Sequence, residues 1–114
     1  MPARSEPAGA VALPEFFGAL DAVEIPLPGV RARILRGSVL CVSMEFDEDV
    51  EVPEHAHGGQ FGIVVAGGMT VRVAGEPRRF EAGDRYEIAA GVPHAAWIDR
   101  GTILIEFFED ADRY

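Results

Sequence analysis

The chain has 114 residues, the length of one ordinary domain, and 48% of them are hydrophobic, enough for a normal buried core. Its formal net charge of -9 argues against a nucleic-acid surface, because phosphates would be repelled. A single cysteine cannot form a disulfide within the chain, and no apolar stretch is long enough to be a signal peptide or a membrane span. We therefore expect a cytoplasmic protein with no nucleic-acid or membrane partner.

The N-terminal residues 1–14 are rich in alanine, proline and glycine, and we predict a flexible arm there, followed by one domain over residues 15–114. Within residues 14–20 the sequence favours one helical turn. Its two phenylalanines, Phe16 and Phe17, are expected to pack onto the rest of the domain.

From residue 30 onward, apolar residues recur with a period close to two, which is typical of β-strands. About nine short strands are predicted, roughly ten residues apart. They cover residues 30–34, 39–46, 50–54, 60–66, 69–74, 78–81, 85–89, 93–98 and 102–108. Gly67-Gly68 and Asp99-Arg100-Gly101 are predicted to be hairpin turns between neighbouring strands. The pattern predicts an all-β sandwich or barrel.

All the histidines fall in one two-part pattern: His55 and His57 lie two residues apart, and His94 follows a Gly-Val-Pro turn. Two side chains at i and i+2 on a strand point to the same face, and a third from a distant segment can close a site. Imidazole is the commonest protein ligand of transition metals. The pattern predicts a metal site inside the domain. The alternatives are structural or solvated histidines, or a barrel that has lost its metal.

These segments resemble the two motifs of the cupin family, the small jelly-roll barrels. The first motif, G-x5-H-x-H-x3,4-E-x6-G, is matched by His55, His57, Gln60 and Gly67. The second, G-x5-P-x-G-x2-H-x3-N, is matched by Gly83, Gly91 and His94. The resemblance extends over about residues 30–108. It implies an all-β cupin jelly-roll barrel of antiparallel strands, with His55, His57, Gln60 and His94 as the metal ligands.

The sequence departs from the family pattern at the fourth ligand. Gln60 stands where the family usually has glutamate, and it comes early after His57, although its distance to Gly67 matches the motif. Similar small cupins use a glutamine there. In the second motif, Ala89 replaces the proline and Ile98 the asparagine, so neither position adds polar chemistry.

An amide in place of a carboxylate keeps an oxygen donor but removes one negative charge. Three neutral imidazoles and Gln60 would leave a divalent ion its full +2 charge, which favours Lewis acidity and a lower pKa of bound water. The affinity for hard ions such as manganese should be weaker. The donor set fits Zn, Ni, Fe or Cu without choosing between them. The alternative role for Gln60 is a hydrogen bond to a ligand imidazole.

Three further positions bear on the cavity. Gly62 and Ala96 are small residues beside the ligands and are expected to leave room for a bound molecule. The resemblance implies that Tyr86 faces the interior, where its phenol could orient a substrate or act as acid or base. The alternative is a core tyrosine with a satisfied hydroxyl. Phe61 and Trp97 fall on the opposite faces of their strands, where packing between sheets or protomers is expected.

Several functions remain open. Similarity to small cupins that process sugar acids implies a metal-dependent isomerase or lyase acting on a small polar molecule, whereas the dioxygenases of this fold imply iron chemistry. The non-catalytic alternative is a module that binds or senses a small ligand. The resemblance also implies a homodimer, to which the segment with Phe16 and Phe17 could contribute by crossing to the partner.

Overall fold

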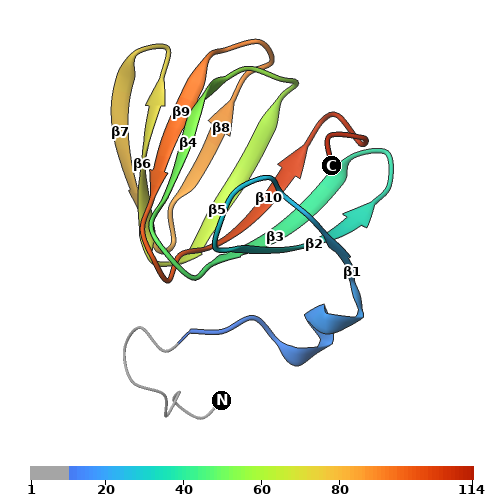
Figure 1. Cartoon of the computed structure of the whole chain (residues 1–114). Coiled ribbons are helices and arrows are strands. Elements are labelled where there is room, and N and C mark those ends of the chain that lie inside the picture. Colours follow the sequence, from blue (N-terminus) through green and yellow to red (C-terminus); the bar gives the residue numbers. More distant parts are fainter. Residues whose placement is uncertain (1–10) are drawn as a thin grey trace.

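The computed structural model describes residues 11–114, which form ten β-strands and one short 3-10 helix (Figure 1). The helix is η1 (Glu15–Ala19), and the strands are β1 (Asp21–Val23), β2 (Val30–Arg36), β3 (Leu40–Phe46), β4 (Val50–His55), β5 (Gln60–Ala66), β6 (Gly68–Val73), β7 (Glu76–Glu81), β8 (Arg85–Ile88), β9 (His94–Ile98) and β10 (Ile103–Phe108). The prediction of an all-β fold is confirmed.

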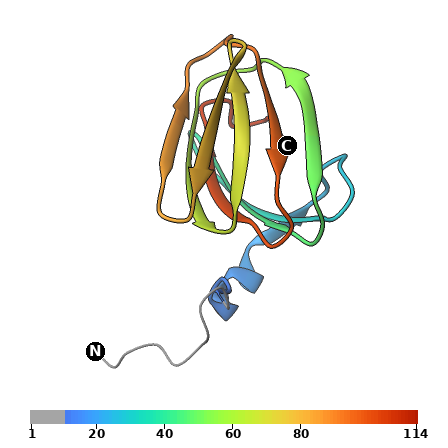
Figure 2. The ribbon, with the colours of Figure 1, turned by 90° about the vertical axis from the view of Figure 1, so that its left-hand side faces the viewer.

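The strands form two antiparallel sheets that face each other around one core (Figures 1 and 2). The larger sheet has six strands in the order β1-β2-β3-β10-β5-β8, and the smaller has four in the order β4-β9-β6-β7. Both sheets contribute to the same buried apolar cluster, for example Val42 and Leu104 from one and Met69 and Ile98 from the other. Burial of this cluster is the main force that holds the two layers together.

The two hairpins predicted at Gly67-Gly68 and at residues 99–101 are wrong. The strands on either side of each turn belong to different sheets, so each turn carries the chain from one layer to the other. Thr102 fastens the two crossings together: its buried hydroxyl accepts a hydrogen bond from the Gly68 N–H at 3.1 Å and donates one to the Gly68 carbonyl at 2.9 Å. Gly67 adopts φ 74°, and a Cβ atom there would lie 2.5 Å from the Thr102 hydroxyl. Glycine is needed for this crossing and not for a hairpin.

The alternation predicted for the strands is confirmed at most positions. Tyr86 and Ile88 are buried inside, whereas Phe61 and Trp97 are exposed outside. The helical turn also forms, as η1, but Phe16 is 75% exposed, so it does not pack onto the domain as predicted. No residue of η1 is buried. Of the predicted arm, residues 1–10 lie outside the described residues. Within residues 11–114, no helix has the length and hydropathy needed to cross a membrane.

Candidate metal centre

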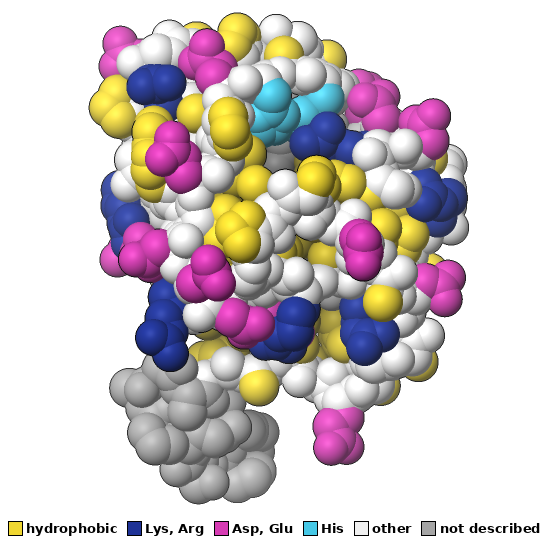
Figure 3. All heavy atoms as spheres, in the orientation of Figure 1, with side chains coloured by type: hydrophobic (Ala, Val, Ile, Leu, Met, Phe, Trp, Pro, Cys, Tyr) yellow, Lys and Arg dark blue, Asp and Glu magenta, His cyan; other side chains and the backbone are white. Residues whose placement is uncertain are grey.

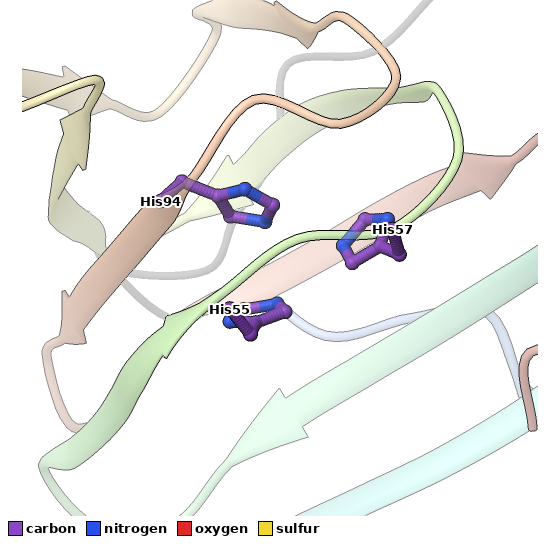
Figure 4. Close-up of side chains that lie close together, drawn as sticks. All are labelled: His55, His57 and His94. Carbon is purple, nitrogen blue, oxygen red and sulfur yellow. The ribbon is translucent and has the colours of Figure 1, made fainter.

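The three histidines lie together at one end of the cavity between the sheets (Figure 4). His55 is the last residue of β4, His57 is in the loop that follows, and His94 opens β9. Because β4 pairs with β9, His55 and His94 are direct cross-strand neighbours, with ring centroids 4.3 Å apart. One ligand atom from each histidine lies within 4.8 Å of the others. The predicted histidine cluster therefore exists in the fold.

Each imidazole is oriented by a backbone carbonyl. The Nδ1 atoms of His55, His57 and His94 lie 2.8 Å from Pro53 O, 2.8 Å from Gly58 O and 2.9 Å from Val92 O, respectively. A carbonyl only accepts hydrogen bonds, so in the neutral ring Nδ1 carries the proton and Nε2 has a free lone pair. Each of the three rings can therefore bind a metal ion through its Nε2 atom.

The loop that carries His57 is held from two sides. The Gly91 N–H donates to the His57 carbonyl at 2.8 Å, which ties this loop to the turn before His94. On the other side, the N–H groups of Gly58 and Gly59 each donate at 3.0 Å to the carboxylates of Asp110 and Glu109. These contacts position a ligand that lies beyond the end of its strand.

Gln60 is the first residue of β5, and its amide is oriented by a buried carboxylate. Its Nε2 donates to Glu106, so Oε1 points the other way and has no hydrogen-bond partner, although it is buried. His57 Nε2 is also buried without a partner. Buried polar atoms without partners are rare in proteins and call for an explanation. A cation bound between the imidazoles and the amide would satisfy both atoms, so the donor set fits a divalent transition metal.

Glu106 is a site residue that the sequence analysis missed. It lies on β10 and is only 5% exposed. The period-two pattern of residues 103–108 contains the signal, because it places Glu106 on the same inward face as Leu104 and Phe108. A single acidic residue in an apolar strand is more often solvated, and only the sheet order shows that this one lies beside Gln60.

Tyr86 reaches the same carboxylate. Its hydroxyl donates to Glu106, which is the satisfied hydroxyl of a core tyrosine. Burial and the neighbouring carboxylate raise the pKa of Tyr86 well above its usual range, so the phenol stays protonated. A direct role in chemistry for Tyr86 stays a prediction.

The expectation that Gly62 leaves room for a bound molecule is wrong. Gly62 pairs with Glu106 on one side and with Tyr86 on the other, so these three residues form one row across β10, β5 and β8. The Tyr86 ring lies over Gly62, and its hydroxyl crosses β5 to reach Glu106. The missing side chain makes space for a tyrosine and not for a ligand. Ala96, by contrast, does line the pocket.

Burial sets the protonation of the site. It lowers the pKa of His57 and of His94, which keeps both rings neutral and able to bind a cation. Burial also raises the pKa of Glu106, while the hydrogen bonds from Tyr86 and Gln60 act in the opposite direction. The centre therefore combines neutral ligands with one acidic group that lies behind Gln60.

Residues 42–103 match the cupin domain family. The chain belongs to the cupin family. The histidines, the two-sheet architecture and the ten-strand order described above are therefore those of a small cupin. No curated protein sequence matches this cupin.

Several solved structures share the fold, and the first two below are also similar in size. KdgF from Halomonas sp. is 25% identical, with a TM-score of 0.70 over 83% of this cupin and 91% of that chain. An RmlC-like cupin from Shewanella frigidimarina is 29% identical, with a TM-score of 0.72 over 84% of this cupin and 88% of that chain. Oxalate decarboxylase from Bacillus subtilis is 17% identical, with a TM-score of 0.71 over 86% of this cupin and 29% of that chain, a likeness of fold alone.

Proposed function

We propose that this cupin binds a divalent transition metal through His55, His57, His94 and Gln60 and uses it to bind or transform a small polar molecule. The observation that supports this proposal is the pair of buried atoms without partners, His57 Nε2 and Gln60 Oε1, which line one pocket. Such a metal would act as a Lewis acid toward a carbonyl, hydroxyl or water. The donor set is compatible with Zn, Ni, Fe or Cu.

The residues around the centre have separate tasks in this proposal. The backbone carbonyls that bond Nδ1 hold the imidazoles in position, and Glu106 holds the Gln60 amide nitrogen, which leaves the amide oxygen free to bind the metal. The Tyr86 hydroxyl donates a hydrogen bond to Glu106 and so fixes the position of this carboxylate. In this proposal the fixed carboxylate helps to orient the substrate. Apolar side chains such as Met69, Ile98 and Phe108 line the rest of the pocket and exclude water from it.

The substrate class that we favour is a sugar acid, and the reaction an isomerisation or ring opening. The support is the size of this cupin, which corresponds to small single-domain relatives over most of their length. A metal-dependent dioxygenase is the second enzymatic candidate. The non-catalytic candidate, a small-ligand binding or sensing module, uses the same pocket without turnover. Fold alone does not choose between them.

The metal can be tested by elemental analysis of tag-free protein. We expect a stoichiometric metal in the native chain and its loss in His57→Ala. A surface variant, Arg78→Ala, serves as the matched control and should keep the metal, because Arg78 is exposed on β7. Circular dichroism checks that each variant is folded. Metal retained by His57→Ala, or a native chain that binds none, would contradict the proposal. A separate assay uses the metal-loaded native protein. Turnover of a sugar acid, or oxygen uptake, would exclude the binding-module alternative.

A further inference from the structure

Residues 109–114 return from the end of β10 to the metal centre. Arg36 holds this segment by donating from Nη2 to the Tyr114 carbonyl at 2.5 Å and from Nη1 to the Ala111 carbonyl. Glu109 and Asp110 bond the backbone of Gly59 and Gly58, in the loop that carries His57. The segment is thus fixed both to strand β2 and to the loop that carries His57.

This fixation brings Arg113 into the pocket that contains the histidines. Its guanidinium lies 5.1 Å from the centroid of the Phe108 ring and 4.9 Å from that of Tyr114. The two rings are nearly perpendicular, with centroids 5.7 Å apart. Aromatic rings hold a guanidinium in place without neutralising its charge. Figure 3 shows a basic side chain directly beside the histidines at a hollow in the surface.

Arg113 forms no salt bridge among the described residues, although the chain contains 19 acidic residues and 10 basic ones. The carboxylate of Glu106 lines the same pocket but does not form an ion pair with Arg113. Arg31, Arg72 and Arg79 each pair with at least one carboxylate. The Nε atom of Arg113 is buried and lacks a hydrogen-bond partner. In an acidic protein, a cation that faces a pocket unpaired is a natural place for an anionic ligand.

We propose that Arg113 is the binding residue for the carboxylate of a ligand whose other end reaches the metal. The inference rests on the proposed function and makes it more specific: the ligand is a small organic acid, bound at two points. A guanidinium suits this task because its N–H groups match a carboxylate in a two-pronged arrangement, and because it stays charged. The competing role is structural, with Arg113 serving only to pack residues 109–114 against Phe108.

A pair of probes that differ only in the acidic group separates these roles. D-glucuronate and D-glucose are titrated calorimetrically into metal-loaded protein, either native or with Arg113→Met, Arg113→Lys or the control Arg78→Met. The native protein and the control should prefer glucuronate to glucose. In Arg113→Met the ratio of the affinity for glucuronate to that for glucose should fall about tenfold or more, which corresponds to about 1.4 kcal/mol. Arg113→Lys should retain part of the preference for glucuronate, because lysine keeps the positive charge but lacks the two parallel N–H donors of the guanidinium.

Metal content and circular dichroism are measured on every variant. Arg113→Met should keep both the metal and the fold, because Arg113 is not among the proposed ligands. A native protein that binds neither probe, or binds both equally, would overturn the inference, as would a preference for glucuronate that survives in Arg113→Met. Absence of metal from the native protein would overturn the proposed function instead, so the two failures are distinguishable.

Discussion

The Tyr86 ring occupies the space that a side chain at Gly62 would need. A Cβ atom on Gly62 would lie 2.1 Å from the ring carbon that bears the hydroxyl and 2.2 Å from the hydroxyl oxygen. Because Gly62 lies between Tyr86 and Glu106 in the sheet, this close approach lets the phenol cross β5 and bond the carboxylate behind Gln60. Gly62 therefore does not enlarge the pocket. It makes room for the hydrogen bond between Tyr86 and Glu106, the two residues that support Gln60 from behind and form the second layer of the site.

Gly62→Ala should therefore destabilise the protein by overpacking, at a cost of about 1–3 kcal/mol in the free energy of unfolding. Urea denaturation measures the change. Gly18→Ala is the matched control and should be close to neutral, because no atom lies within 4 Å of a Cβ atom built there. If Tyr86 is the cause, Tyr86→Ala should remove most of the penalty of Gly62→Ala, so additive effects in the double variant would refute this explanation.

The Gln60–Glu106 pair predicts a change of metal preference. Gln60→Glu puts a carboxylate beside Glu106 and removes the Nε2 donor, so we expect lower stability of the metal-free protein. The added negative charge should at the same time raise the affinity for Mn²⁺ relative to Zn²⁺, because hard ions favour carboxylate ligands.

The double variant Gln60→Glu, Glu106→Gln restores one donor and one acceptor with the positions exchanged. It should recover the stability lost in Gln60→Glu and keep the stronger Mn²⁺ binding. Competition titrations with the two ions, together with thermal unfolding of the metal-free forms, test both points. A double variant no more stable than Gln60→Glu would show that the hydrogen bond to Glu106 is unimportant.

Cys41 predicts a pH-dependent reactivity. It lies on the outer face of β3, partly buried, and this burial raises the pKa of its thiol. A raised pKa leaves less thiolate at any given pH, so alkylation by iodoacetamide should be slower in the folded protein than in urea. The folded protein should need a higher pH to reach half its maximal rate. Equal pH profiles in the two states would contradict the prediction.

The outer face of the six-stranded sheet predicts self-association. Phe61 and Phe107 are cross-strand neighbours on β5 and β10, they are 37% and 39% exposed, and their ring centroids lie 6.3 Å apart. We expect a homodimer that covers this pair, as stated above for small cupins, and Phe107→Glu should shift it toward monomer. Light scattering gives the masses. Arg78→Glu, exposed on β7 of the other sheet, is the control; a monomeric native protein would rule the dimer out.

The sequence by itself was sufficient for the fold class and for the histidine cluster. The fold class follows from alternation along each strand, which decides the face that a residue takes. The histidine cluster follows from the spacing of His55 and His57 together with the resemblance of the segment around His94 to the second cupin motif. These regularities can be recognised in one segment without knowing which strands are its neighbours. They also place Tyr86 inside and Phe61 outside, as the structure confirms.

Only the tertiary structure decided which strands are neighbours, and with them the second layer of the site. Alternation gives the face of a strand but not its partner. It therefore predicts hairpins at Gly67 and Gly101, whereas in the structure these residues lead from one sheet to the other. The meeting of Gln60 with Glu106, and of Arg113 with the pocket, depends on contacts between segments 46 residues or more apart in the chain. Their energies arise from burial and from charges brought close together, quantities that exist only once the sheets have packed.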